Sequence, residues 1–402
     1  CLVSIPLAPI KDNKKKALYL RPQVSYGWDH SAPMLTLGIY DDVELEVRDN
    51  ITIDALHMES RPVNGYKNAT VRIQASVIAD NNVGTCRLQT EIQPCNFRGK
   101  RYYSERLVRI SEGTREISVR MQLDDVSLWY PWPLGQPNLY ELKVNIYKGK
   151  TILDKRSLRI GIREVKLLPN KGYRHQPLPS IHDWTNNFFY EASREQGIPF
   201  PKRPKKGTYN WTVTINGKSL FVVGGNWLPA DLLFSRANRD MYLRLVKQAR
   251  HAGLSILRIW GGGTIEKQSF FDACDEQGIM IWHDFPLGHD PVRSRPSYLD
   301  LLERQCRQIL RKLRHHPSII AWDGGNELYG ALKKHYPLFD VLRHVCDEEM
   351  PGIVFRETSP VHPEQHGPWM FDPDHYSRWD SLKTTFQSEA GCAGMPDMAS
   401  LK

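Results

Sequence analysis

The feature that most constrains the fold is a change in hydrophobic periodicity near Leu220. Before it, from residue 51 to 165, short runs rich in β-branched and aromatic residues are separated by turn residues. After it, short apolar runs alternate with segments whose apolar residues recur every three or four positions. The first pattern is typical of antiparallel strands, and the second of repeated strand–helix units that build a parallel sheet. A chain of 402 residues is long enough for two or three such domains.

The first region predicts a β-sandwich, because it holds many short strands with turn signals between them. An earlier alternation over 34–48, which ends in Val43–Val47, predicts one further strand. Residues 169–210 are rich in proline, lysine and aromatic residues without a clear period, which predicts a long loop. The strands expected in the sandwich are 51–58, 70–79, 86–93, 106–110, 115–122, 140–147 and 157–162.

The second region predicts a (β/α)8 TIM barrel, because strands and amphipathic helices alternate along it. Only seven strands can be placed before the chain ends, so the barrel is expected to be incomplete. A doubly wound sheet is the alternative, but no glycine-rich first turn supports it. The expected strands are 221–223, 255–260, 279–285, 318–322, 353–358, 369–375 and 384–388, and the expected helices include 267–276 and 331–349.

Composition excludes several classes of function. The net charge of +9 comes from basic residues that are spread along the chain, which disfavours a nucleic-acid partner. No apolar run approaches the ~18 residues of a membrane helix. The seven cysteines form no CxxC pair, which predicts free thiols and no metal site or cofactor, with a Cys86–Cys95 pair left open. A first residue of Cys1 is interpreted as a cut from a longer protein, with a lipoprotein-type cysteine as the alternative.

Polar and aromatic residues gather at the ends of the predicted parallel strands, where barrel enzymes place their chemistry. Two of them, Glu327 and Glu389, are carboxylates that could face one pocket. Glycoside hydrolysis needs such a pair, one to protonate the leaving oxygen and one to attack the anomeric carbon or activate water. The alternative for each glutamate is a cap on the following helix. The other strand-end residues are Asn226, Trp227, Arg258, Trp260, Asp284 and Asn326, and three glycines at 261–263 predict a tight turn near Trp260.

These segments resemble glycoside hydrolase family 2, and within it the β-mannosidase branch. The resemblance is carried by Arg258-Ile-Trp-Gly-Gly-Gly, Trp282-His-Asp-Phe, Gly325-Asn-Glu and Ser388-Glu-Ala-Gly, in the family's order. Two further matches, Phe271-Asp-Ala-Cys-Asp-Glu-Gln-Gly and His316-Pro-Ser-Ile-Ile, lie between them, and Ser25-Tyr-Gly-Trp-Asp resembles the branch's N-terminal domain.

The family implies a jelly-roll domain that binds sugar, an immunoglobulin-like sandwich and a catalytic TIM barrel. Transferred to this chain, residues 1–48 would be the tail of the jelly roll. Residues 49–168 would be the sandwich, and 169–402 the barrel without its eighth strand. The compartment stays open, with a secreted, periplasmic or lysosomal location favoured over a nuclear one.

The resemblance also implies roles for individual residues. Glu327 would be the acid/base and Glu389 the nucleophile of a retaining reaction, with about 5–5.5 Å between their carboxyl groups. Asn326 would bind the sugar 2-hydroxyl. Arg258 is the expected cation that keeps Glu389 ionised. The other expected substrate contacts are Trp260, Asp29 from the jelly roll, and, as supporting residues, Asn226, Trp227 and Asp284.

Some positions differ from the β-mannosidase branch, so the sequence does not decide which sugar is the substrate. His283, Gly325 and Ala390 stand where the branch usually has Gln, Asn and an aromatic residue. Cys392-Ala-Gly-Met-Pro is more similar to endo-β-mannosidases and exo-β-glucosaminidases. Trp379 could be a second sugar platform or a core residue, and Asp29 could simply cap its own turn. The sequence therefore predicts a retaining β-mannosidase that acts on terminal β-D-mannosyl residues of oligosaccharides or glycans. The alternatives are an exo-β-glucosaminidase, an endo-β-mannosidase, another family 2 β-glycosidase, or an inactive carbohydrate-binding remnant.

Overall fold

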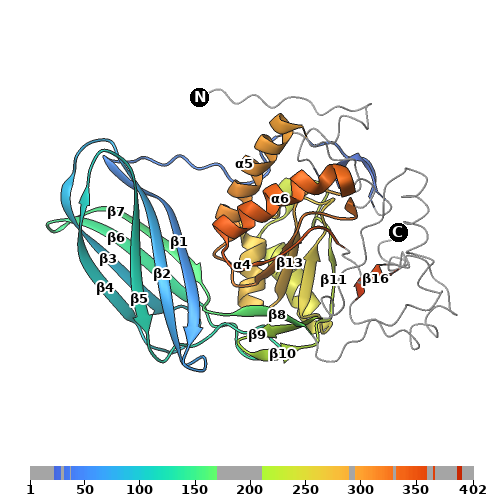
Figure 1. Ribbon diagram of the computed structural model, residues 1–402, viewed down its shortest axis with the longest axis horizontal. Coiled ribbons are helices and arrows are strands. Elements are labelled where there is room, and N and C mark those ends of the chain that lie inside the picture. Colours follow the sequence, from blue (N-terminus) through green and yellow to red (C-terminus); the bar gives the residue numbers. More distant parts are fainter. Residues whose placement is uncertain are drawn as a thin grey trace.

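The computed structural model describes an antiparallel β region followed by a parallel sheet with helices (Figure 1). A short 3-10 helix, η1 (Gln23–Tyr26), precedes both. Among the described residues, none of the helices combines the length and hydrophobicity needed to cross a membrane. The described ranges are 22–28, 31–36, 38–169, 211–288, 295–328, 332–359, 365–366 and 387–391.

The antiparallel region contains all seven strands that the sequence predicts. They form a sheet of order β1-β2-β5 and a sheet of order β4-β3-β6-β7. In β2 the odd-numbered residues from Val71 to Val77 are buried between the sheets, as expected from the two-residue period of a strand. The strands are β1 (Ile51–Val63), β2 (Asn68–Ala79), β3 (Gly84–Pro94), β4 (Tyr102–Ile110), β5 (Gly113–Leu123), β6 (Tyr140–Lys148) and β7 (Thr151–Ile160).

The strand expected over 34–48 is absent, which corrects that prediction. The described residues of this segment form no strand, and Val43, Leu45 and Val47 are 77%, 93% and 91% exposed. Alternating apolar residues make a strand only where a partner edge supplies hydrogen bonds. The pairing of Cys86 with Cys95 is also wrong, because both cysteines are free.

A small antiparallel sheet connects the two regions. It has the order β10-β9-β8, made of β8 (Val165–Pro169), β9 (Trp211–Ile215) and β10 (Lys218–Leu220). Val213 and Ile215 of β9 share an apolar cluster with Ile256, Met280 and Trp282 of the parallel sheet. Figure 1 shows this small sheet below the parallel strands. It therefore covers the apolar part of the sheet at the starts of the strands.

The parallel sheet has its five strands in the order of the chain, β11-β12-β13-β14-β15. One face packs against all four helices through residues such as Leu257 and Ile259, while Ile256 belongs to the cluster on the other face. A doubly wound sheet would carry helices on both faces; the described helices lie on one. The elements are β11 (Gly224–Trp227), β12 (Ile256–Ile259), β13 (Met280–Asp284), β14 (Ile319–Asp323), β15 (Val354–Arg356), α3 (Arg239–His251), α4 (Gln268–Gln277), α5 (Pro296–Leu313), α6 (Leu332–Glu349) and a 3-10 turn, η3 (Phe234–Arg236).

Of the strands predicted in this region, one is misplaced and one lies outside the described residues. The first parallel strand is Gly224–Trp227, not 221–223, where Phe221 is 87% exposed. The expected strand 369–375 lies outside the described residues. The last predicted strand is present as β17 (Gln387–Glu389), which pairs in parallel with β16 (Gln365–His366), a strand that the sequence did not predict.

Candidate active site

Arg258 is the centre of a polar cluster on the face of the parallel sheet opposite the helices. Arg258 lies near the end of β12 and is only 4% exposed. Its guanidinium makes a two-point ion pair with Asp284 at the end of β13, at 2.6 and 3.2 Å. It also donates to Asn226 Oδ1 on β11 at 3.3 Å and to Asn326 Oδ1 after β14 at 2.7 Å. One cation thus joins residues on or just after four neighbouring parallel strands.

Asp284 is fully enclosed, and the main-chain N–H of Gly261 donates to it at 3.0 Å. Burial raises the pKa of the Asp284 carboxyl, while Arg258 and the Gly261 amide act against that shift. Burial alone would lower the pKa of Arg258, but Asp284 and Glu389 turn the net shift upward. The ion pair therefore keeps a charged arginine inside the site.

The fourth partner of Arg258 is Glu389, the last residue of β17. Arg258 Nη1 lies 2.8 Å from Glu389 Oε2, and the Glu389 side chain is 18% exposed. The predicted contact between Arg258 and Glu389 is confirmed. A guanidinium at this distance favours the ionised form of a carboxylate that is still open to a ligand.

Glu327 is held on a tight turn after β14. Its φ of 48° is a left-handed conformation that costs a non-glycine residue ~1–3 kcal/mol. The turn is tied to the loop after β13 by Asn326 N–H donating to Leu287 O (2.8 Å), and to the loop after β15 by Glu327 N–H donating to Ser359 O (2.9 Å). Hydrogen bonds on both sides thus maintain this strained conformation.

Gly325 explains one departure from the family pattern. Its φ is 152°, and a Cβ at this position would lie 2.5 Å from Leu287 O. Its carbonyl accepts hydrogen bonds from Ser359 N–H and Thr358 Oγ1, both at 3.0 Å. A side chain cannot fit here without moving the loop that carries Glu327.

His366 brings the two glutamates together. Its Nε2 lies 2.9 Å from Glu327 Oε1 and 3.3 Å from Glu389 Oε2, and its Nδ1 lies 3.0 Å from Ser388 Oγ. The side chains of His366 and Glu327 are 2% and 8% exposed. Sequence reasoning missed His366, because a single histidine outside a recognised motif or predicted strand carries no local signal. Its role became visible only through the pairing of β16 with β17.

Trp260 lies beside this cluster, and the glycines after it accommodate its ring. A Cβ on Gly262 would lie 2.0 Å from the indole of Trp260, and a Cβ on Gly261 would lie 2.3 Å from Leu287 O. The expected tight turn is therefore required by close contacts. Trp28 packs on Trp260 with ring centroids 5.2 Å apart. This aromatic pair anchors the loop around Trp28 at the parallel sheet.

The structure does not bring every expected residue to the cluster. Trp227 follows Asn226 on β11 and faces the helices, where its indole donates to Glu266 at 2.8 Å and packs on Phe270. Successive residues of a strand face opposite sides, so only Asn226 joins Arg258. His283 likewise stacks on Trp322 on the helix side, and burial lowers its pKa to about 4. Asp29 and Trp379 lie outside the described residues.

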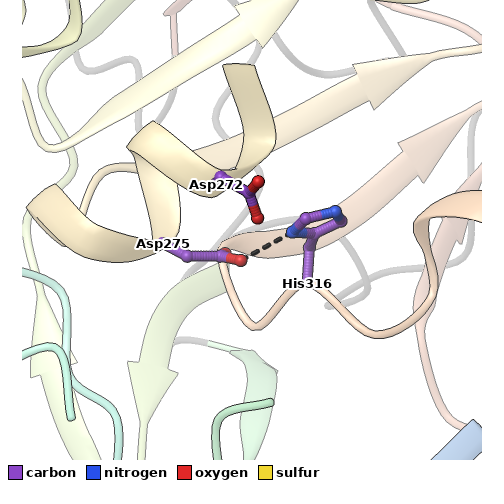
Figure 2. Close-up of side chains that lie close together, drawn as sticks. All are labelled: Asp272, Asp275 and His316. Atoms are coloured by element: carbon purple, nitrogen blue, oxygen red, sulfur yellow. Dashed lines mark hydrogen bonds and ion pairs between the residues drawn. The ribbon is translucent and has the colours of Figure 1, made fainter. Parts of the chain in front are cut away.

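One group of side chains outside this cluster has the composition of a metal site. Asp272 and Asp275 of α4 lie close to His316, with possible ligand atoms within 4.8 Å of one another (Figure 2). Asp275 instead accepts from His316 Nδ1 at 2.6 Å and from Ser318 N–H at 3.0 Å, and Asp272 pairs with Arg159 at 2.8 Å. These contacts make the group a structural link between α4, the sandwich and the segment before β14.

Comparison with known proteins agrees with this architecture. The sequence model of Glycosyl hydrolases family 2 matches residues 51–163. Beta-mannosidase B of Thermothelomyces thermophilus is 26% identical over 412 residues, which cover 94% of this chain and 43% of that protein. The chain thus spans less than half the length of the curated relatives that it matches.

Solved structures share the fold at lower identity. A beta-D-mannosidase from Dictyoglomus thermophilum matches with a TM-score of 0.70 and 24% identity, covering 85% of this chain and 39% of that one. An exo-chitosanase from Amycolatopsis orientalis matches with a TM-score of 0.64 and 18% identity, covering 88% of this chain and 39% of that one. These similarities extend across both the antiparallel and the parallel regions.

Proposed function

The chain belongs to glycoside hydrolase family 2 and is related to beta-mannosidase B, and on this basis we propose that it is the catalytic part of a retaining β-glycosidase. We propose terminal β-D-mannosyl residues of oligosaccharides or glycans as its substrate. The mannosidases among its relatives support this sugar. So does Arg258-Ile-Trp-Gly-Gly-Gly, since family 2 galactosidases and glucuronidases tend to carry Arg-x-x-His-Tyr-Pro at this place.

The observation that carries the proposal is the convergence of Glu327 and Glu389 on one imidazole nitrogen. Their distances to His366 Nε2 are 2.9 and 3.3 Å, so their contacting oxygens are no farther apart than the sum, about 6.2 Å. Retaining enzymes hold their carboxyl groups ~5–5.5 Å apart, and inverting enzymes ~6.5–9.5 Å apart. The upper limit supports the retaining class.

The proposed reaction is a double displacement. The Glu389 carboxylate attacks the anomeric carbon while Glu327 gives its proton to the departing glycosidic oxygen, so the C–O bond to the aglycone breaks as the bond to Glu389 forms. Water then attacks the same carbon, Glu327 takes a proton from it, and Glu389 leaves as a carboxylate. The configuration is inverted twice, so a β-glycoside yields a β-sugar.

The surrounding residues have separate proposed tasks. Arg258 orients Glu389 and keeps it ionised. Arg258 also donates to the Oδ1 of Asn326 and so fixes the side chain that is proposed to bind the sugar 2-hydroxyl. Trp260 is the proposed aromatic contact for the sugar ring, although it is only 4% exposed here, and Trp28 packs against it. Asp29 and Trp379 are kept as further proposed substrate contacts.

We propose the same domain division as the sequence predicts, with boundaries near residues 48 and 168. The consecutive order of five parallel strands and the placement of four helices on one face support a barrel for residues 169–402. The order of the sandwich strands, with three in one sheet and four in the other, supports an immunoglobulin-like unit for residues 49–168.

Hydrolysis of a series of p-nitrophenyl β-D-glycosides by the purified protein tests the proposed substrate. We expect kcat/KM to be highest for the mannoside and at least tenfold lower for the glucosaminide, galactoside and glucuronide, because each of these differs at positions that the pocket must recognise. A preference for the glucosaminide would instead support an exo-β-glucosaminidase. Sugar binding without hydrolysis of any substrate would indicate a carbohydrate-binding protein.

Replacing Glu327 with alanine tests the acid/base role. The loss of kcat/KM should depend on the leaving group, because a dinitrophenolate leaves without protonation and a poor leaving group does not. We expect a loss of roughly 10²–10⁴-fold for phenyl β-mannoside and about tenfold or less for the dinitrophenyl substrate. Parallel assays of both substrates on the variant and the unchanged protein measure the difference.

Added azide provides the stereochemical control for this variant. It should attack the glycosyl–Glu389 intermediate from the β face and give a β-glycosyl azide, identified by NMR. An α-glycosyl azide from Glu327→Ala would reverse the two assignments.

A further inference from the structure

A cavity whose lining includes neither Glu327 nor Glu389 lies between the sandwich and the helical region. It encloses about 580 Å³. One wall is the outer face of β1 and β2, and the opposite wall is the segment between α5 and β14 with the turn after α6. The linker around Arg163 closes it from a third side. This cavity therefore exists only because the two regions are packed together.

His57 of β1 is the first unusual residue in its wall. Its neighbour Met58 faces the sandwich core, so His57 faces the opposite side, yet it is only 5% exposed. Within the described part of the chain neither ring nitrogen has a hydrogen-bond partner, and a carboxylate oxygen of Glu59 lies 3.9 Å from Nε2. Buried polar groups are nearly always paired. Burial and the neighbouring Arg314 lower the His57 pKa to about 3, so the ring is neutral near pH 7 and has one N–H to donate.

Arg163 is the second unusual residue in the wall of the cavity. Both of its hydrogen bonds go to main-chain carbonyls, those of Pro317 and Ile319. Among the described residues, no carboxylate lies within ion-pair distance of it. Burial lowers the pKa of Arg163 to about 10, so the group is still charged near pH 7. Asp275 acts on it electrostatically without forming an ion pair. A buried cation without a close counter-ion is costly, and a ligand anion would relieve that cost.

Among the other charged side chains around the cavity, basic ones outnumber acidic ones. Glu164 forms an ion pair with Lys166 at 2.8 Å and accepts a hydrogen bond from the Tyr66 hydroxyl at 2.8 Å. Arg314 pairs with Glu349 through Nη1 at 2.7 Å, but its buried Nε has no partner. Arg72 of β2 makes one hydrogen bond to another described side chain, a 3.4 Å contact with Ser118 Oγ. Arg61 completes the cationic wall. Glu59 stands opposite Arg72 in the β1–β2 pairing and acts electrostatically on Arg314, but among the described residues it forms no ion pair with a lysine or arginine.

We propose that this interdomain cavity binds a small oxyanion, such as a phosphate or the phosphate group of a sugar ester. Arg72 would contact it from the sandwich, Arg163 from the linker and Arg314 from the helical region, with the His57 N–H as a neutral donor. Arginine guanidinium groups match the oxygens of phosphate in geometry and charge. Because the anion would contact both regions, it would also hold them together. None of these residues belongs to the cluster around Glu327 and Glu389, so the inference is independent of the proposed hydrolase.

Isothermal titration of the purified protein with inorganic phosphate in a chloride buffer tests the site. We expect saturable binding of one phosphate with a Kd of about 1 mM or below. Arg72→Gln should weaken binding at least tenfold, because it removes a charge without removing any strong contact of the fold. His57→Leu should weaken it a few-fold, since a neutral donor is lost. Arg109→Gln on β4, an exposed arginine of the other sheet, is the control with the same charge change and should bind within twofold of the unchanged protein.

Thermal unfolding gives a second readout. Phosphate should raise the unfolding midpoint of the unchanged protein and of Arg109→Gln more than that of Arg72→Gln, beyond the general salting-out effect that all three share. Glucose 6-phosphate that binds tenfold more tightly than phosphate would identify a sugar ester as the ligand, and equal affinity would identify the free oxyanion. The absence of saturable binding up to 10 mM, or equal affinities of Arg72→Gln and Arg109→Gln, would overturn the proposal.

Discussion

Replacing Glu389 with alanine should abolish hydrolysis of every β-glycoside that the protein cleaves, by roughly 10⁴-fold or more in kcat. The proposed covalent intermediate cannot form without this carboxylate, and no leaving group can compensate for its loss. This distinguishes Glu389 from Glu327, whose removal is expected to spare activated substrates. Initial rates on nitrophenyl and phenyl mannosides, with the folded state checked by circular dichroism, provide the measurement.

Glu357→Ala is the matched control for this prediction. Glu357 follows β15 and pairs with Arg343 at the surface, where its side chain is 41% exposed. Its removal should leave kcat within twofold. Azide should partly restore turnover of Glu389→Ala by attacking from the face that the carboxylate occupied, which gives an α-glycosyl azide. The nucleophile assignment fails if Glu389→Ala keeps more than a tenth of the activity or if the azide product is β.

Arg258→Met is expected to lower the free energy of unfolding strongly. It would leave Asp284, which is fully enclosed, without its cation, and removal of one partner of a buried ion pair typically costs ~3–5 kcal/mol of unfolding free energy. Turnover should also fall, because Glu389 and Asn326 would lose the group that orients them. Urea unfolding gives the free energy, and nitrophenyl mannoside hydrolysis gives the activity.

Two further variants identify the cause of this loss. Arg258→Met/Asp284→Asn removes the uncompensated charge, so the double variant should be destabilised by less than the sum of the two single ones. Arg343→Met breaks an exposed pair and should cost at most ~1 kcal/mol. Additive losses in the double variant would contradict the ion-pair explanation.

The pH dependence of the Arg258→Met variant follows from the direction of the Asp284 shift. Burial already raises the pKa of this carboxyl in the folded protein, and loss of Arg258 raises it further. A carboxyl with a folded pKa above its unfolded value binds more protons when folded, so it reduces stability as the pH rises above the unfolded pKa. The stability deficit of Arg258→Met should therefore be smaller at pH 5 than at pH 7.

The sequence by itself determined most of the secondary structure and singled out Glu327 and Glu389 as the candidate catalytic pair. Period-two runs predicted all seven sandwich strands, and helical periodicity predicted the helices on the parallel sheet, because these patterns record which side of each element is buried. The two glutamates were proposed because short motifs at strand ends occur in the order of the family that the chain resembles. The contact of Arg258 with Glu389 was also expected, because a carboxylate that must stay ionised needs a cation beside it.

Tertiary structure alone decided which neighbours these residues have. Val43–Val47 alternates like a strand but has no partner edge, and Trp227 faces the helices although its neighbour Asn226 faces the site. His366 reaches both glutamates only because β16 pairs with β17, and Trp28 meets Trp260 across more than two hundred residues. Local pattern specifies burial and period, but the side that a residue faces and its distant partners depend on how the elements pack together.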